Sequence, residues 1–298
     1  MEEVLLMGNI FMRFPGGRKK ALTLSYDDAT RQDIRLIAIM KQYGLKGTFN
    51  VSTGILAPAG TVYQTGTIHQ RMEKNELAEV YGKSGMEVAV HGHTHPYLDQ
   101  LPMNLCLEEI ERNRLELEAQ FGTIVRGMAY PYGRYPDELV KLLPALGIAY
   151  ARTTVSSGCF ELPKDWLRLE ATCHHKDGRL MELAEEFVEK EAKKAPWLFC
   201  LWGHSFEFDR DDNWDVIEQF ASRVGSREEI WYATNLEIYD YVQAYGRLIY
   251  SMDGSRVCNP TDQRLYFEAG EQIWSVGSGE MVEIIPEVMG MPGLRVSN

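Results

Sequence analysis

Residues 21–28 of the chain read Ala-Leu-Thr-Leu-Ser-Tyr-Asp-Asp. Leucines alternate with small polar residues, which is typical of a buried strand, and two carboxylates follow directly at Asp27 and Asp28. Like charges held close together raise the pKa of one group unless a cation compensates, so the pair suits one metal ligand and one general base. Taken alone, however, the eight residues favour a solvated turn, because Asp-Asp-Ala-Thr is also a good helix start.

The composition is that of a folded, acidic protein. The 298 residues are 45% hydrophobic and 25% charged, which argues against disorder and allows one large α/β domain with a small appendage. The net charge is −12 at pH 7, and the one basic run, Arg18-Lys19-Lys20, is short. Nucleic acid is therefore not expected as a partner, since phosphate contacts need clustered lysine and arginine.

Cysteine usage and the start of the chain predict a cytoplasmic protein. The five cysteines are scattered, without CxxC spacing, as expected for free thiols in a reducing compartment. The first residues, Met-Glu-Glu-Val-Leu-Leu-Met-Gly-Asn, lack the basic region and apolar core of a signal peptide. No apolar run approaches the length of a transmembrane helix, so no membrane partner is expected. A homo-oligomer is compatible with the sequence.

Strand and helix patterns alternate regularly between residues 21 and 247. Short apolar strands are separated by helical patterns, of which residues 31–43 and 105–121 are clear examples. The alternation predicts a parallel sheet, and the number of strands favours closure into a barrel, with the chemistry at the carboxyl ends of the strands. Beyond residue 247, turn signals separate short alternating runs. We therefore predict an α/β barrel at 1–247 and a small antiparallel β appendage at 248–298.

Four of the seven histidines follow predicted strands. His91, His93 and His95 come after one strand, and His204 ends a late one, so a barrel would gather them at the mouth that holds the Asp-Asp pair. Three imidazoles within five residues have the density of a metal site. In a helical turn His91 and His95 share a face, whereas in an extended strand all three point to one side. Because a proline follows His95, a turn is expected, which selects His91 and His95 as ligands and makes His93 a supporting residue.

Four motifs, taken in order, resemble the NodB-type polysaccharide deacetylases of carbohydrate esterase family 4. They span about residues 20–240 and are Ser25-Tyr-Asp-Asp28, His91-x-x-x-His95, Ala129-Tyr-Pro-Tyr-Gly133 and Leu201-Trp-Gly-His204. The resemblance implies a distorted (β/α)7, TIM-like barrel and one divalent metal ion. Zinc is the ion expected, with cobalt, nickel and manganese as alternatives.

The resemblance also implies a role for each motif residue. Asp27 matches the catalytic base, His204 matches the general acid, and Tyr132 matches the residue whose backbone N–H helps to hold the oxyanion. The implied metal ligands are Asp28, His91 and His95. The implied reaction removes an N-acetyl (or O-acetyl) group from a sugar or oligosaccharide, with metal-activated water as the nucleophile.

The chain departs from the family pattern at two points. The family arginine two residues before the Pro-Tyr-Gly motif is replaced by Ala129, and Arg126 falls on the opposite face of the strand. Arg152, on the following strand, is therefore the candidate to steady Asp27. The family aspartate that orients the general acid has Asp165, in the pair Asp165-Trp166, as its candidate counterpart, and a loop aspartate beside a structural tryptophan explains the pair equally well.

The remaining candidates are aromatic residues and two polar stretches. Tyr130 and Trp202 are predicted to lie near the mouth, where aromatic rings suit sugar stacking, although core packing explains Trp202 equally well. His69 could line the mouth from the second loop, but the surface of that loop is the expected place. The Cys173-His174-His175 triplet is predicted to lie in a loop with a surface or packing role, and residues 207–215 are predicted to form a solvated loop.

Three other hypotheses compete with deacetylation. The first is cyclic amide or imide hydrolysis by allantoinase-like relatives of the same fold. The second is an amidohydrolase with His91-Gly-His93 as a metal-binding pair, but that pair normally ends the first strand, which here carries Asp27. The third is a catalytically impaired barrel that binds a glycan, with the β appendage as a binding module, and the intact set of catalytic residues argues against it.

Overall fold

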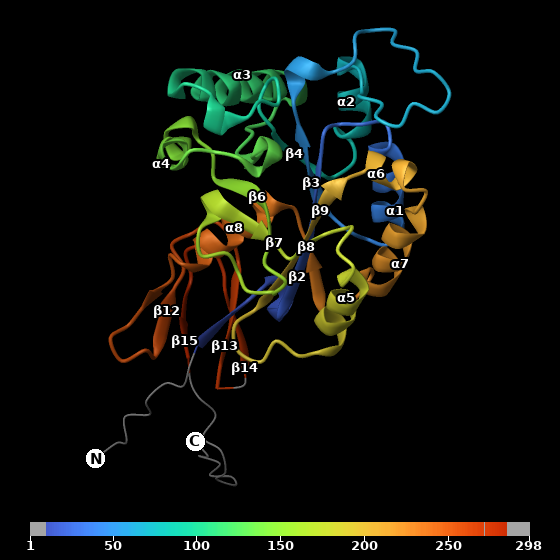
Figure 1. Cartoon of the computed structure of the whole chain (residues 1–298). Helices are drawn as coiled ribbons and strands as arrows, with labels where there is room; N and C mark the ends of the chain where they lie inside the picture. Colours follow the sequence, from blue (N-terminus) through green and yellow to red (C-terminus); the bar gives the residue numbers. More distant parts are fainter. Residues whose placement is uncertain (1–9, 271, 285–298) are drawn as a thin grey trace, which may run out of the picture.

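The computed structural model of the chain describes residues 10–270 and 272–284 (Figure 1). Its main sheet is parallel, with the strand order β7-β6-β5-β4-β3-β2-β9-β8. These strands are β2 (Lys20–Asp27), β3 (Gly47–Val51), β4 (Glu87–Val90), β5 (Gly127–Ala129), β6 (Tyr150–Ser156), β7 (Leu169–Ala171), β8 (Cys173–His174) and β9 (Trp197–His204). The predicted distorted (β/α)7 barrel is confirmed, and antiparallel sheets are added to it.

Two short strands, β7 and β8, close the sheet. Only Thr172 separates β7 from β8, and β7 pairs with β6 while β8 pairs with β9, so one extended segment bridges the two edges of the sheet. The Thr172 backbone N–H donates to the Cys200 carbonyl at 2.8 Å. The prediction of a loop for the triplet Cys173-His174-His175 is therefore wrong, because Ala171 and Cys173 are fully buried and hold the segment in the barrel.

Strand β2 is the central strand of the molecule. All eight of its residues are buried, and it pairs with β9 along its whole length. Along its other edge, β2 pairs with two strands: β10 (Ile230–Tyr232) pairs with residues 20–22, and β3 pairs with residues 24–27. The alternating stretch that opens the sequence therefore brings Asp27 to the mouth of the barrel with neighbours on both sides.

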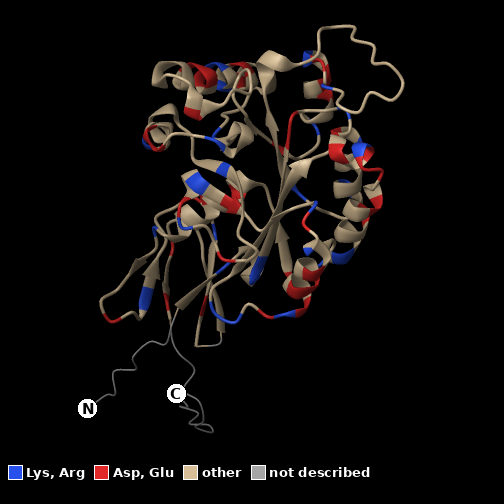
Figure 2. Ribbon diagram, viewed as in Figure 1, with Lys and Arg blue, Asp and Glu red and all other residues tan. Residues whose placement is uncertain are grey.

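Eight α-helices within the described residues surround the barrel. They are α1 (Asp33–Gln42), α2 (Lys74–Val80), α3 (Met103–Phe121), α4 (Asp137–Leu142), α5 (Leu180–Glu189), α6 (Phe206–Arg210), α7 (Trp214–Val224) and α8 (Asn235–Tyr245). Acidic and basic residues are interspersed along the outer helices (Figure 2). An ion pair links α7 to α5 through Arg223 and Glu185. None of the described helices is long and apolar enough to cross a bilayer.

Two small antiparallel sheets lie beside the barrel, at the lower left of Figure 1. One has the order β1-β13-β14 and the other the order β11-β12-β15. Their strands are β1 (Ile10–Arg13), β11 (Ile249–Tyr250), β12 (Arg256–Cys258), β13 (Leu265–Ala269), β14 (Gln272–Val276) and β15 (Met281–Glu283).

The first of these sheets joins the two ends of the described chain. Strand β1 pairs with β13 in the register Ile10 to Ala269, and Tyr241 of α8 donates a hydrogen bond to the Arg13 carbonyl at 2.7 Å. Residues from both sides of the proposed boundary at 247 therefore share one sheet, and the boundary itself stays a prediction. Residues 1–9, where a signal peptide was sought, and residues 285–298 of the predicted appendage lie outside the described residues.

Candidate active site

The carboxyl ends of four barrel strands meet at one mouth. Strand β2 ends at Asp27 and β4 leads directly into His91, while Arg152 lies in β6 and His204 ends β9. The Asp27 carboxylate is the meeting point, since its Oδ2 lies 3.8 Å from Nε2 of His91 and 3.9 Å from Nε2 of His204. Because parallel strands bring their ends to one side of a barrel, side chains far apart in the sequence converge here.

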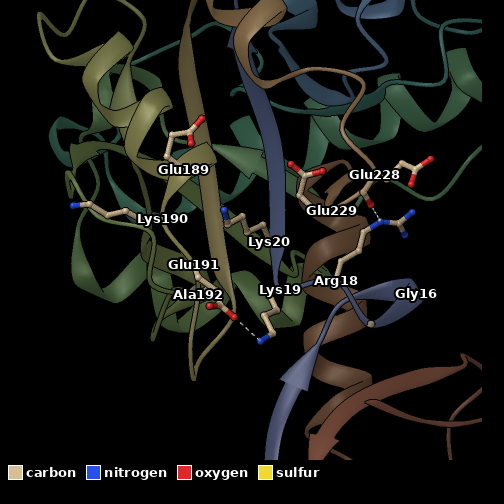
Figure 3. Close-up of a pocket in the computed structure, with 11 residues that line it drawn as sticks. Gly16, Arg18, Lys19, Lys20, Glu189, Lys190, Glu191, Ala192, Glu228 and Glu229 are labelled. Atoms are coloured by element: carbon tan, nitrogen blue, oxygen red, sulfur yellow. Dashed lines mark hydrogen bonds and ion pairs between the residues drawn. The ribbon is translucent and has the colours of Figure 1, made fainter. Parts of the chain in front are cut away.

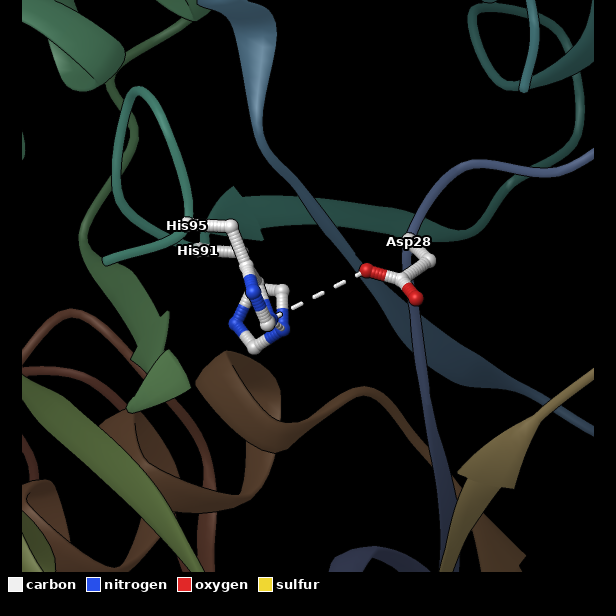
Figure 4. Close-up of side chains that lie close together, drawn as sticks. All are labelled: Asp28, His91 and His95. Carbon is white, nitrogen blue, oxygen red and sulfur yellow. Dashed lines mark hydrogen bonds and ion pairs between the residues drawn. The ribbon is translucent and has the colours of Figure 1, made fainter. Parts of the chain in front are cut away.

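Asp28, His91 and His95 form a cluster (Figure 4), and His91 of this cluster lies beside Asp27. One ligand atom from each residue lies within 4.8 Å of the other two. The Nε2 atoms of His91 and His95 are 3.1 Å apart, and Nε2 of His95 is 3.9 Å from Oδ1 of Asp28. Two imidazole nitrogens and one carboxylate oxygen in this arrangement are a donor set suited to zinc.

The contacts and protonation states of the cluster suit a cation. Nδ1 of His91 donates to the Ala129 carbonyl at 2.9 Å, which leaves the lone pair of its Nε2 facing the cluster. Burial and the His91 imidazole lower the pKa of His95 to about 4, so this ring is neutral at pH 7. Oδ1 of Asp28 is buried and accepts no hydrogen bond. These residues therefore fit a divalent ion.

Backbone strain is concentrated in the same cluster. Asp28 has φ 82°, His95 has φ 56° and Tyr132 has φ 58°, all in the left-handed region that non-glycine residues rarely adopt. Each such conformation costs about 1–3 kcal/mol and is typical of functional sites. The Tyr132 ring packs edge-on against His95 at a centroid distance of 4.4 Å and stacks on Tyr97 at 4.1 Å. The predicted oxyanion residue therefore lies beside the predicted metal ligands.

Asp27 is held as a buried carboxylate. Nη2 of Arg152 donates to its Oδ1 at 2.5 Å and to its Oδ2 at 2.6 Å, and the Asn50 amide donates to Oδ1 at 2.8 Å. Burial alone would raise the pKa of Asp27, but the charge and hydrogen bonds of Arg152, with the charge of His204, outweigh burial and lower it. Arg152 itself is fixed by Ser25, whose hydroxyl accepts from Nε at 3.0 Å. Arg152 thus occupies the place for which it was a candidate.

His204 also lies beside Asp27, and it contacts Glu207. Its Nδ1 is 3.3 Å from Oε2 of Glu207, one turn later in α6. Burial lowers the pKa of His204, but the hydrogen bond to Glu207 and the charges of Asp27 and Asp28 outweigh burial and raise it. His204 is thus favoured as a proton donor.

Asp165, the candidate to orient His204, is engaged elsewhere. Its Oδ1 accepts from the Leu167 backbone N–H at 2.9 Å, and its Oδ2 accepts from Arg168 at 2.7 Å, so it caps a short helical turn. Glu207 occupies the place beside His204 instead. The expected solvated loop at 207–215 is wrong as well, because Glu207 lies in α6 with its side chain 11% exposed.

Three other candidates are buried rather than open to a substrate. Tyr130 is 1% exposed and donates its hydroxyl to the Leu167 carbonyl at 2.8 Å. Trp202 is also buried, with the Arg152 guanidinium 4.6 Å from its ring centroid. His93 turns away from the metal-ligand cluster, and its Nδ1 lies 3.1 Å from the Thr53 hydroxyl.

His69 is closer to the site than its sequence suggests. Its Nε2 lies 3.4 Å from Oδ2 of Asp28, and its ring meets Phe206 edge-on at 4.5 Å. The sequence of this loop has no periodic pattern from which a contact between His69 and Asp28 could be predicted. A histidine in the long loop after the second barrel strand was the only hint.

A separate pocket lies at the opposite end of the barrel (Figure 3). Its lining comes from the segments that precede β2, β9 and β10, including Lys19, Lys20, Glu189 and Glu229. Because parallel strands start here, the pocket is remote from the strand ends that carry Asp27 and His204. Its mixed charges pair with one another, as Lys19 does with Glu191 at 3.0 Å.

Comparison with known proteins identifies the fold and the family. Residues 15–151, which contain the Asp-Asp pair, both ligand histidines and the Pro-Tyr-Gly motif, match the family model named polysaccharide deacetylase. These residues belong to the polysaccharide deacetylase family. The matching family is the one that the four motifs resemble. No curated protein matches the chain.

Several solved structures resemble the chain at low sequence identity. A candidate polysaccharide deacetylase from Mycobacterium smegmatis covers 78% of this chain and 93% of its own, with 17% identity and a TM-score of 0.54, and shows the shared fold. A Streptococcus pyogenes deacetylase, solved with acetate, is 25% identical over 48% of this chain and 59% of its own length, with a TM-score of 0.42. A family 4 pseudoenzyme from Bacillus anthracis is 17% identical over 77% of this chain and 68% of its own, with a TM-score of 0.46.

Proposed function

We propose that the chain is a metal-dependent deacetylase that removes an N-acetyl (or O-acetyl) group from a sugar or oligosaccharide. The observation that carries the proposal is the arrangement around Asp27. A carboxylate-and-imidazole cluster that fits a divalent ion lies beside it, and so does a protonatable histidine. An acid, a base and an electrophilic centre around one point are what amide hydrolysis requires.

Asp28, His91 and His95 would hold the ion, for which zinc is our proposal because of its preference for nitrogen and oxygen ligands in this combination. When bound, such an ion polarises a carbonyl oxygen and lowers the pKa of water. Three protein ligands leave room for a water molecule and for the carbonyl group of an acetyl substituent.

Asp27 would act as the general base. Arg152 and Asn50 keep it ionised and fix both of its oxygens, so that it takes a proton from the attacking water without changing position. The lowered pKa of Asp27 makes it a weak base, which suits a water molecule whose own pKa has been lowered. The backbone N–H of Tyr132, beside His95, would donate to the developing oxyanion.

His204 would act as the general acid. When it is protonated, Nδ1–H is directed at Glu207 and Nε2–H points toward the Asp27 side, where the leaving group departs. The proton on Nε2 passes to the amine nitrogen as the carbon–nitrogen bond breaks, which prevents expulsion of an amide anion.

Acetate release is the direct test. The purified chain, loaded with zinc, would be assayed against a panel of N-acetylated and O-acetylated sugars and oligosaccharides, with Asp27→Asn and His204→Ala as controls. We expect acetate release from at least one N-acetylated member, and a fall of about 10²–10⁴-fold in kcat in each variant. Acetate release that Asp27→Asn leaves unaltered would contradict the proposal. A silent panel with metal bound would favour cyclic amide or imide hydrolysis.

The proposed cellular location and the size of the substrate are argued from the cysteines. The five cysteines are all free. Free thiols agree with the proposed cytoplasmic location, in which a small acetylated sugar is a more accessible substrate than a cell-wall polymer.

A further inference from the structure

Three imidazoles converge on one oxygen of Glu207. Oε2 of Glu207 lies 3.1 Å from Nε2 of His174, 3.3 Å from Nε2 of His175 and 3.3 Å from Nδ1 of His204. His174 ends β8, His175 follows it, and His204 ends the neighbouring strand β9. The carboxylate that receives them is nearly buried, with 11% of its side chain exposed.

The tautomers of the two flanking rings are set by their other nitrogens. Nδ1 of His174 accepts the Lys176 backbone N–H at 3.1 Å, so in the neutral ring the proton lies on Nε2 and is donated to Glu207. Nε2 of His175 likewise donates to Glu207, since its Nδ1 is buried without a partner beside Gly203. A Cβ built on Gly203 would collide with that Nδ1, so glycine is what leaves room for the ring.

This arrangement disfavours a second metal ion in the cluster of His174, His204 and Glu207. A metal ion would need the lone pair of Nε2 of His174. The Lys176 backbone N–H donates to Nδ1 of the same ring, so the ring proton lies on Nε2 and that lone pair is taken. The second oxygen of Glu207 faces cations, with Arg210 donating at 2.8 Å and the Lys176 ammonium 3.8 Å away. Donors and positive charges surround this carboxylate, which is the environment of an anionic hydrogen-bond acceptor.

We propose that Glu207 is the positioning residue of His204, held in place by His174 and His175, and that it directs the other ring nitrogen of His204 at the reaction centre. The proposal rests on the proposed function, in which His204 is the general acid. By accepting Nδ1–H, Glu207 fixes the ring and leaves Nε2 as the atom that faces Asp27. The other two imidazoles and Arg210 restrain the carboxylate so that it cannot follow the ring.

Kinetics of Glu207→Gln provide the first test, because the amide has the same shape but only one acceptor and no charge. We expect kcat to fall by about 10²-fold, as for other misplaced catalytic groups, with KM within about threefold and metal content unaltered. Glu207→Asp should regain part of the lost kcat. The control is Asp211→Asn, since Asp211 pairs with Arg210 and Lys176 but contacts none of the three imidazoles, and its kcat should stay within about threefold.

The tautomer of His204 provides the second test, which does not depend on activity. Long-range proton–nitrogen NMR spectra of the ¹⁵N-labelled, zinc-loaded protein at alkaline pH should show His204 protonated at Nδ1, with the signal assigned by its loss in His204→Ala. In Glu207→Gln this single tautomer should give way to a mixture. Circular dichroism checks that each variant is folded, and if Glu207→Gln does not fold, Glu207→Asp and the wild-type spectrum decide.

Several outcomes would overturn the proposal: wild-type kcat in Glu207→Gln, loss of kcat only through loss of metal, or a wild-type His204 protonated at Nε2. A fall in kcat in Asp165→Asn without one in Glu207→Gln would return the orienting role to Asp165. If the wild-type chain releases acetate from no substrate, the proposed function fails, while the NMR result still decides whether Glu207 positions His204.

Discussion

Two clusters of imidazoles and a carboxylate flank Asp27 at the same barrel mouth, yet they present opposite chemistry. In the metal-ligand cluster of Asp28, His91 and His95, a backbone carbonyl takes the Nδ1 proton of His91, so the Nε2 lone pair of His91 faces the cluster. In the Glu207 cluster, the Lys176 backbone N–H donates to Nδ1 of His174, so the Nε2–H of this ring donates to the Glu207 carboxylate.

The difference teaches that residue type alone does not define a metal site. Both clusters satisfy a simple count of nearby histidine and acidic side chains. The partner of the remote ring nitrogen decides which tautomer forms, and the tautomer decides whether a cation or a hydrogen bond is favoured. Charges act in the same direction, since Arg210 and Lys176 approach Glu207.

The largest expected effect is removal of the metal. Chelation, or His95→Gln, should reduce kcat by about 10³-fold or more, because the several kcal/mol that an ion contributes to stabilising the transition state are lost. Metal analysis should find one divalent ion per chain in the wild type, less in His95→Gln, and one in the matched variant His174→Gln. Two ions per wild-type chain, with one lost in His174→Gln, would break the contrast between the clusters.

The next effect concerns Arg152, the cation that pairs with Asp27 between the two clusters. Arg152→Met should lower the free energy of unfolding by about 3–5 kcal/mol, because Asp27 becomes a buried charge without its partner. Denaturant unfolding of the metal-free protein measures it. Arg126→Met, which removes a half-exposed pair with Asp240, should cost about 1 kcal/mol or less.

A double variant sharpens the interpretation of Arg152. Asp27→Asn removes the charge that Arg152 compensates, so adding Asp27→Asn to Arg152→Met should recover part of the lost stability. A double variant that is less stable than Arg152→Met alone would show that the guanidinium acts through packing against Trp202 instead.

A smaller effect is the pH dependence that His175 confers on stability. Burial lowers the pKa of His175 to about 4, below the value of about 6.5 expected in the unfolded chain. The unfolded chain therefore binds the extra proton between pH 6.5 and 4, and stability should decrease by roughly 2–3 kcal/mol as the pH falls through this range. Comparison with His175→Gln isolates the contribution. An equal decrease in the variant would assign the pH dependence to other groups, such as His95.

The smallest effect is expected for His174→Gln. One of the three donors to Glu207 is weakened, at a cost of about 1 kcal/mol for a single hydrogen bond, so kcat should fall by roughly fivefold with the same metal content. Steady-state kinetics and metal analysis on one preparation measure both. A rise in activity would contradict the view that His174 restrains Glu207.

The fold and half of the site could be predicted because their signals are local. The alternating stretch 21–28, the strand–helix alternation and the spacing of His91 and His95 are properties of short segments. They were enough to predict the barrel and the clustering of Asp28 with both histidines.

The acid side of the site could not be predicted because it depends on contacts between segments. Glu207 lies in a run of charged residues that is typical of solvent-exposed loops, and nothing in that run shows that α6 turns it inward. Asp165 matched a motif but caps its own helical turn. Strand β8 has two residues, too few for any periodicity, and its place is set by pairing with β9.

The pairing of β1 with β13 sets an order for folding during synthesis. Strand β1 leaves the ribosome early, but its partner is among the last described segments, so β1 stays unpaired while the whole barrel is made. Closing so long a loop is slow, and an unpaired strand edge is exposed to other chains in the meantime. The barrel is therefore free to fold first, and the β1-β13-β14 sheet can form only after the barrel strands have been made.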